Sequence, residues 1–206
     1  TAIGWAALSG ALAFLLFGWA VAGVVAVVVA VALSLPRGQV LMRILGIDPG
    51  SRFTGFGIID ARGDRATHVQ HGVIRTGKGE FTERLGIIFA ELRDVIRDHG
   101  PVEVAVETVF VSHNVASALK LGQARGAAVC AAISMGLPVA EYSPRSVKQA
   151  IVGRGGADKV QVQHMVSVLL QLAETPPEDA ADALAVALCH QHTQQTANRM
   201  QALQKP

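Results

Sequence analysis

Residues 44–60, ILGIDPGSRFTGFGIID, decide how the first half of the folded region is built. Ile44–Ile47 is a short apolar run that ends at an Asp-Pro-Gly turn beginning with Asp48. Gly55–Ile59 is a second apolar run, reached through residues rich in Gly and Ser. Two such runs joined by a turn are typical of a β-hairpin. The stretch therefore predicts two antiparallel strands, with Asp48 at the end of the first.

The apolar pattern outside this hairpin predicts a mixed α/β domain. Further strands are predicted at Ala66–Arg75, Val102–Val106 and Val139–Tyr142, and helices at 81–96, 115–135 and 159–172, with two or three helices finishing the domain. The order βββαβαβα, a meander that feeds a parallel half, is ribonuclease H-like. It predicts a mixed five-stranded sheet with helices on both faces.

Four carboxylates lie in strongly apolar segments, where a negative charge is unfavourable. Asp48 ends the first strand, Glu107 ends the strand in VEVAVETVF, and Asp179 and Asp182 are three residues apart in EDAADALAVAL. Neighbouring parallel strands bring their ends to one edge of a sheet, and a three-residue spacing puts two acids on one helical face, about 5–6 Å apart. Because acids so close together repel, they need a shared cation.

The predicted site calls for Mg²⁺, with Mn²⁺ as a substitute, since these hard ions prefer oxygen ligands. Singly, each acid also has an ordinary explanation: a turn residue for Asp48, a strand-end ion pair for Glu107, or a charge at a helix N-terminus for Asp179 or Asp182. Together they favour hydrolysis of a nucleic-acid phosphodiester, in which two metals activate a water and stabilise the leaving 3′ oxygen.

Charge composition neither requires nor excludes a nucleic-acid partner. The chain has 18 Lys and Arg and 16 Asp and Glu among 206 residues, and half of its residues are hydrophobic. A nucleic-acid partner would therefore need a local basic patch and not a basic protein.

Residues 1–41 form an apolar leader with no charge before Arg37. Leu8–Leu35 exceeds the roughly 20 residues that span a bilayer, and Arg37 and Arg43 after it would leave the remainder cytoplasmic. The interpretation that we favour is read-through of GC-rich upstream DNA, because Met42 stands immediately before the first strand. A fragment of another membrane protein is a third possibility. We expect a cytoplasmic domain in each case, and a membrane partner only if the leader is genuine.

Five segments together resemble the RuvC Holliday junction resolvases, from Met42 to about His192. They are ILGIDPGSRFTGFGIID, VEVAVETVF, ASALKLGQARGAA, VKQAIVGRGGADKVQVQHMV and EDAADALAVAL, in that order. The resemblance implies a nuclease domain at 42–192, followed by a polar tail at 193–206.

The same resemblance implies that Asp48, Glu107, Asp179 and Asp182 are the catalytic residues and the ligands of two ions per site; none of the four is substituted. It further implies a homodimer that places two such sites on opposite strands of a four-way DNA junction. Paired symmetric nicks would then resolve the junction in recombination and repair, together with the RuvA and RuvB branch-migration proteins.

Other residues acquire expected roles from this resemblance. Phe110 is similar to an aromatic that stacks on an unpaired base near the crossover, and Lys148 and Lys159 resemble lysines that approach backbone phosphate. Ala116–Gly126 is similar to the family's dimer helix, whose small residues permit close approach. The plain alternatives are a core aromatic, solvated lysines and a helix buried within one subunit.

Three other functions remain open from the sequence. A YqgF-type ribonuclease H-like RNA nuclease shares the first motif, and an actin or sugar-kinase type ATPase has a similar first phosphate loop but needs a second domain. The third is a non-catalytic junction-binding or membrane-scaffold protein, for whose function the apolar leader would matter more than the four acids.

Overall fold

The computed structural model describes residues 41–108 and 114–203 of the 206-residue chain. The predicted leader therefore falls, apart from Leu41, outside the described residues. Among the residues that are described, no helix is both long and apolar enough to cross a membrane.

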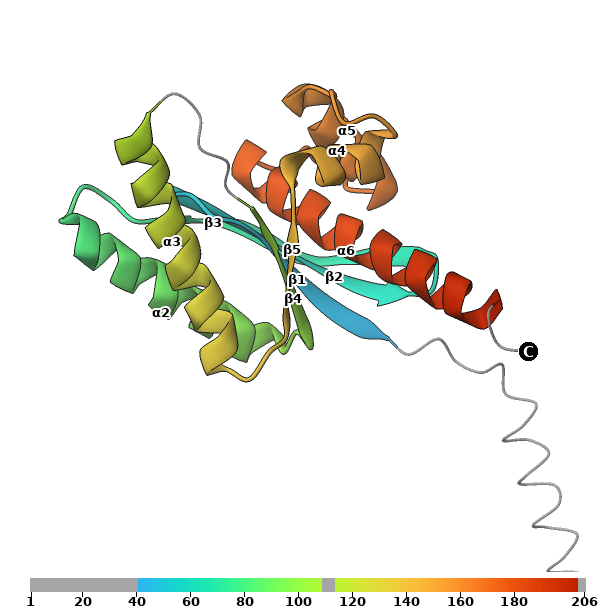
Figure 1. Ribbon diagram of the computed structural model, residues 1–206, viewed down its shortest axis with the longest axis horizontal. Helices are drawn as coiled ribbons and strands as arrows, with labels where there is room; N and C mark the ends of the chain where they lie inside the picture. The colour runs from blue at the N-terminus through green and yellow to red at the C-terminus, as the bar shows by residue number, and fades with distance from the viewer. Residues whose placement is uncertain (1–40, 109–113, 204–206) are drawn as a thin grey trace, which may run out of the picture. The chain divides into compact units, whose positions relative to one another are not determined.

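A single five-stranded sheet forms the centre of the domain (Figure 1). Its strands are β1 (Met42–Asp48), β2 (Phe53–Arg62), β3 (Arg65–Arg75), β4 (Glu103–Glu107) and β5 (Val139–Tyr142). They lie in the order β3-β2-β1-β4-β5. The pairs β1–β2 and β2–β3 are antiparallel, whereas β1–β4 and β4–β5 are parallel. The predicted hairpin and mixed ribonuclease H-like sheet are confirmed.

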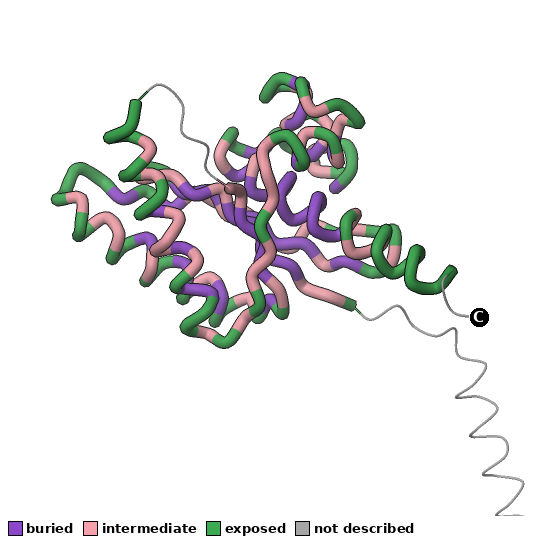
Figure 2. The backbone as a smooth tube through the Cα atoms, viewed as in Figure 1, coloured by how far each residue is buried: buried purple, intermediate pink, exposed green. Residues whose placement is uncertain are grey.

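Helices cover both faces of the sheet. They are α2 (Phe81–His99), α3 (Val115–Ser134), α4 (Pro144–Val152), α5 (Lys159–Leu169) and α6 (Glu178–Leu203). Helices α2 and α3 pack together on one face, and α6 crosses the other face with α4 and α5 against it (Figure 1). The sheet thus separates two apolar clusters, one towards α6 and one towards α2 and α3, and Figure 2 shows the buried residues concentrated along the strands and the inner side of α6.

Local sequence signals begin and end these helices. The side chain of Asn114 accepts a hydrogen bond from the backbone N–H of Ser117 at the start of α3, and Asp158 forms a capping box with Gln161 at the start of α5. Gly100 ends α2 in the left-handed conformation that favours glycine. The end of α2 and the starts of α3 and α5 therefore lie at residues whose types favour helix termini.

Residues 193–206 were expected to be a polar tail, but α6 continues through most of them. The side chain of Gln195 donates a hydrogen bond to the carbonyl of Gly63, and Arg199 pairs with Asp64 at 2.6 Å. These contacts join the last turns of α6 to the turn between β2 and β3. The polar stretch up to Leu203 is therefore the end of the helix that carries Asp179 and Asp182.

Candidate active site

The sheet brings two of the predicted carboxylates to one edge. Strands β1 and β4 are parallel neighbours, and Ile47 is paired in register with Val106. The next residue of each strand is the acid, Asp48 on β1 and Glu107 on β4. The carboxyl ends of two adjacent strands therefore deliver the two acids side by side, as the sequence predicted.

Glycines in the strands let α6 bring in the other two acids. A Cβ atom added to Gly55 would lie 1.9 Å from the carbonyl oxygen of Asp179, and one added to Gly46 would lie 2.1 Å from that of Ala183. No real side chain fits at such distances, so the backbone of α6 lies directly on β1 and β2. This close contact fixes the height of Asp182 above the strand ends.

One cavity of about 210 Å³ is lined by most of the predicted site residues. Its charged lining consists of Asp48, Glu107, Asp182, Lys148 and Lys159, and Pro144, Val147 and Val162 complete the wall. Three acids from β1, β4 and α6 thus face two lysines from α4 and α5.

Asp179 lies beside this cavity and does not line it. Its charge nevertheless reaches the site, because it raises the pKa of Asp48 and of Asp182. Of the four acids predicted from the sequence, three line this cavity. The fourth, Asp179, lies about one helical turn before Asp182 and affects the cavity through its charge.

Burial makes ionisation of the two strand-end acids difficult. It is the largest cause that raises the pKa of Asp48 to about 7, and the charges of Asp182 and Asp179 raise it further. Burial likewise raises the pKa of Glu107 to about 8, with the charges of Asp48 and Asp182 as the next causes. The site therefore holds more negative charge than its surroundings neutralise.

The lysines supply part of the missing positive charge. The Lys159 ammonium pairs with Glu178, and its Nζ lies 3.7 Å from Oδ2 of Asp182. The hydrogen bond to Glu178 is the main reason that the pKa of Lys159 is raised. Lys148 acts at longer range, since its charge lowers the pKa of Glu107 and of Asp182 against the effect of burial.

The donor set fits a hard divalent cation. Asp48, Glu107 and Asp182 offer only oxygen ligands, and the pKa of each is raised mainly by burial and further by the charges of neighbouring acids. Within residues 41–108 and 114–203, no three His, Cys, Asp or Glu side chains are already arranged as a metal-binding group.

The predicted DNA-contact residues have different outcomes. Lys148 and Lys159 both line the cavity, so each can reach a ligand placed over the acids. Phe110 falls in 109–113, outside the described residues. Its expected role in base stacking stays a prediction.

Sequence reasoning missed the glycines on which α6 rests. Gly46, Gly55 and Gly57 lie inside strands, and each would place a Cβ atom within 2.6 Å of α6. A signal was available, because glycine at alternate positions of a strand often marks close approach of another backbone. The matching signal on α6 is its run of small residues, of which Ala183 and Ala187 face Gly46.

Comparisons with known proteins agree with this geometry. The family model described as crossover junction endodeoxyribonuclease RuvC matches residues 44–190. The RuvC of Pseudomonas paraeruginosa is 58% identical over 153 residues, which cover 74% of this chain and 88% of that protein. The RuvC of Alkalilimnicola ehrlichii is 55% identical over 150 residues, covering 73% of this chain and 91% of that protein.

Solved structures extend the comparison to the fold. The chain is similar to Thermus thermophilus RuvC in complex with Holliday junction substrate, with a TM-score of 0.71, 38% identity and coverage of 76% of this chain and 96% of that one. It shares the fold, at 13% identity and a TM-score of 0.60, with the yeast mitochondrial Holliday junction resolvase Ydc2, over 80% of this chain and 84% of that one. On the match of sequence, fold and carboxylate edge, this chain belongs to the crossover junction endodeoxyribonuclease RuvC family.

Proposed function

We propose that this endonuclease resolves four-way DNA junctions in recombination and repair by paired, symmetric, metal-dependent nicks. The observation that carries the proposal is the single cavity in which Asp48, Glu107 and Asp182 meet Lys148 and Lys159. A relative that is 38% identical was solved in complex with Holliday junction substrate, which supports a junction as the substrate of this chain. The family match favours this function over an RNA nuclease or a scaffold.

The carboxylates form the cation-binding side of the site. Asp48, Glu107 and Asp182 hold Mg²⁺, or Mn²⁺ in its place, and Asp179 is the fourth acid, available to a second ion. Ions bound there would provide Lewis-acid chemistry, with an activated water for attack and stabilisation of the leaving 3′ oxygen. The chain itself contributes the fixed positions of the acids on two strand ends and one helix, which orient the attack.

The lysines form the phosphate-binding side. Lys148 in α4 and Lys159 at the start of α5 line the same cavity as the acids, and they present ammonium groups to a backbone placed over the acids. Such contacts position DNA without reading its sequence.

Paired nicks require two such sites, so we propose a homodimer that contacts through α3. Val115 and Leu119 are 66% and 62% exposed on this helix, and a Cβ atom at Gly122 would meet nothing within 4 Å. An apolar, open helix face is suited to a second copy. The chain would act in the cytoplasm, where chromosomal junctions and the RuvA and RuvB proteins are found.

The test is cleavage of a synthetic four-way junction. With Mg²⁺, we expect two nicks at symmetric positions of opposite strands, and no cleavage of a linear duplex of the same sequence. Asp182→Asn removes a ligand charge with little change of volume, so it should abolish nicking while junction binding in EDTA persists. Cleavage of the duplex, or full activity of Asp182→Asn, would refute the proposal.

A further inference from the structure

A second cationic surface lies at the other side of the strand ends. A hollow of about 630 Å³ is lined by Arg52, Phe53, Arg75, Gly77, Lys78, Gly79 and Arg84. Its four cations come from the turn after β1, the end of β3, the loop after β3 and the first turns of α2. We call Arg52, Arg75, Lys78 and Arg84, together with Phe53, the β3-side patch.

Among the described residues, none of the four cations of the β3-side patch forms an ion pair. Four other arginines pair with nearby acids, in Arg43–Asp60, Arg97–Asp94, Arg125–Glu141 and Arg199–Asp64. Further arginines of the described residues are also unpaired, but the β3-side patch gathers four unpaired cations in one hollow. Positive charge that is left unpaired in one hollow of a nearly neutral protein is available to an anionic partner.

Contacts within the β3-side patch hold its members in place. Nη1 of Arg84 donates a hydrogen bond to the carbonyl of Ser51 at 3.1 Å, and its Nε is buried without a partner among the described residues. The guanidinium of Arg75 lies 5.4 Å from the ring centroid of Phe53, which is itself 46% exposed. An exposed aromatic ring that supports a guanidinium gives a preorganised surface for phosphate.

The sheet register places this surface next to the acids. Asp48 is the Cα partner of Gly55, and Phe53, two residues from Gly55, is the partner of Arg75. Side chains two residues apart in a strand share a face, so Phe53 and Arg75 lie on the face of the sheet that carries Asp48. Strand spacings of about 4.8 Å and a rise of about 3.3 Å per residue separate Asp48 from Arg75 by roughly 12 Å.

The acids therefore lie between two cationic surfaces. Lys148 and Lys159 come from α4 and α5 and line the acid cavity itself, whereas the β3-side patch lies across β1 and β2 from it. A DNA strand held over Asp48 by the two lysines would next pass the β3-side patch, at a distance of about two to four nucleotides.

We infer that the β3-side patch binds the phosphodiester backbone of the junction arm that leaves the acids on the β3 side. This inference rests on the proposed function, and it assigns to the arm a binding surface separate from the lysines. The contact is to phosphate, so it is independent of base sequence and strengthens as salt is lowered.

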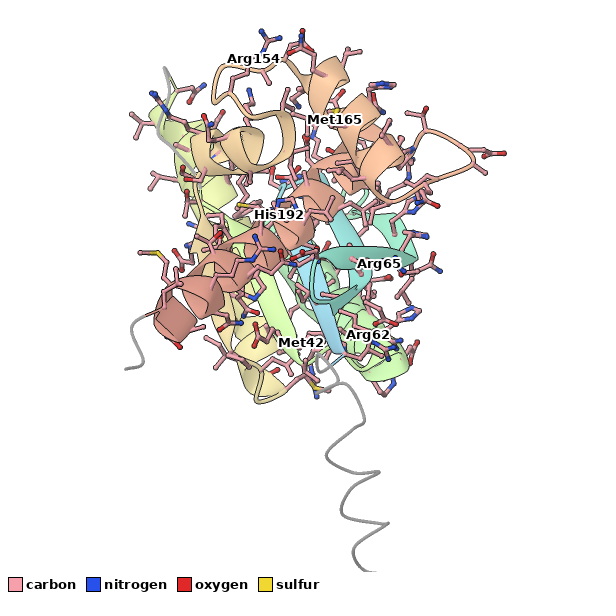
Figure 3. The ribbon with its side chains drawn as sticks, turned by 90° about the vertical axis from the view of Figure 1, so that its right-hand side faces the viewer. Met42, Arg62, Arg65, Arg154, Met165 and His192 are labelled. Atoms are coloured by element: carbon pink, nitrogen blue, oxygen red, sulfur yellow. The ribbon has the colours of Figure 1, made fainter. Side chains whose placement is uncertain are left out.

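The test compares two double variants that remove equal charge from opposite ends of the β2–β3 hairpin. Arg75→Gln with Lys78→Gln neutralises the β3-side patch. Arg62→Gln with Arg65→Gln is the matched control, since those arginines are also exposed, lie at the opposite ends of β2 and β3 and lie near Met42, where β1 begins (Figure 3). Junction affinity is measured in EDTA over a series of salt concentrations, and thermal unfolding checks that both variants are folded.

We expect the patch variant to bind the junction about tenfold more weakly at 0.1 M salt, with a salt slope smaller by about 2. The control should stay within twofold of the parent protein. Methylphosphonate groups placed two to four nucleotides from the cleaved phosphate should weaken binding by the parent but not by the patch variant. Equal affinities and slopes for the two variants would overturn the inference. If the parent protein itself neither binds nor cuts a junction, it is the proposed function that fails.

Discussion

Ionisation of Asp48 and Glu107 is less favourable in the folded protein than in the unfolded chain. Their pKa values are raised to about 7 and about 8, from ordinary values near 4, mainly because they are buried. Between pH 4 and pH 8 the folded state therefore binds more protons than the unfolded state. The free energy of unfolding contributed by these acids is highest at low pH and falls as pH rises through that window.

This linkage gives a prediction for the metal-free protein. We expect the free energy of unfolding to fall by a few kcal/mol between pH 5 and pH 8.5, since each unit of pKa shift corresponds to ~1.4 kcal/mol. Under the proposed function Mg²⁺ binds the ionised acids, and we then expect it to raise Tm more at pH 8.5 than at pH 5.5. Chemical denaturation and thermal unfolding, each with Mg²⁺ or EDTA, measure the two effects.

Asp48→Asn is the control for that prediction, because an amide of nearly the same volume carries no charge. The variant should be more stable than the parent at pH 8.5 in EDTA, should depend less on pH, and should lose most of the Mg²⁺ effect. A parent protein whose Tm shift with Mg²⁺ is the same at both pH values would contradict the assignment of these acids as cation ligands.

At the scale of elements, the site depends on how closely α6 lies on the sheet. The closest approach is at Gly55, where a Cβ atom would meet the Asp179 carbonyl oxygen at 1.9 Å. Backbone cannot yield as a flexible side chain can, so any larger residue must push the first turn of α6 away from β2. The acids of α6 would move with that turn.

Gly55→Ala should therefore reduce stability by roughly 1–3 kcal/mol and reduce junction cleavage more than junction binding. Gly86→Ala is the matched control, because a Cβ atom at this exposed position of α2 meets nothing within 4 Å. Within a helix that change should stabilise by about 0.5–1 kcal/mol and leave cleavage unchanged. Chemical denaturation and single-turnover cleavage distinguish the two; a fully active Gly55→Ala protein would show that the close contact is not needed.

The sequence predicted the parts of the site that follow from strand topology. Asp48 and Glu107 come together because residues at the ends of adjacent parallel strands must do so, and this follows from the order of elements alone. The difference between Asp182, which lines the cavity, and Asp179, which does not, depends on the rotation of α6. Three-residue spacing leaves that rotation undetermined, and only the contacts with Gly46 and Gly55 define it.

A buried polar network was equally inaccessible to sequence reasoning. His190 on α6 lies 2.5 Å from Oε2 of Glu103 on β4, and its other ring nitrogen is 2.8 Å from the hydroxyl of Tyr142 on β5. The three residues are far apart in the chain and have no characteristic spacing. Their hydrogen bonds tie α6 to β4 and β5 at His190, just before the polar stretch through which the helix continues to Leu203.

At the scale of the whole molecule, the proposed paired nicks require two copies of the chain. Leu119 lies within Ala116–Gly126 of α3 and is 62% exposed, so its side chain contributes little to the folding of one copy. Leu119→Asp should give a folded monomer, because a carboxylate in an apolar contact between copies would be desolvated without a partner.

Ile133→Asp provides the control on the same helix, since Ile133 is 60% exposed but lies outside Ala116–Gly126. Sedimentation equilibrium should show a dimer for this control and a monomer for Leu119→Asp. On a supercoiled plasmid that extrudes a cruciform, the control should produce linear DNA in one binding event, and the monomer only nicked circles. A dimeric Leu119→Asp protein would place the contact elsewhere.

The distribution of charge also belongs to this scale. A composition that is close to neutral gives no indication of a nucleic-acid partner, so such a partner would require a local basic patch. The fold supplies one by bringing Arg52, Arg75, Lys78 and Arg84 together from separate segments, while acids pair with some of the other arginines, such as Arg43 and Arg125. Net charge cannot reveal such segregation, because it arises only when the chain folds.

Lys159 contacts Glu178 and Asp182, so in the free protein its ammonium group occupies part of the place that a bound cation would take. One ammonium group cannot neutralise these acids and a DNA phosphate at the same time. We therefore expect a cation that enters the cavity to release Lys159 to DNA, and DNA that engages Lys159 to strengthen the attraction of the acids for a cation. Thermodynamic reciprocity then requires that Mg²⁺ raise junction affinity by the same factor as the junction raises Mg²⁺ affinity. In Lys159→Gln we expect both factors, measured by calorimetry with an uncleavable junction, to shrink together towards one; a variant that kept the full factor would show that this exchange does not operate.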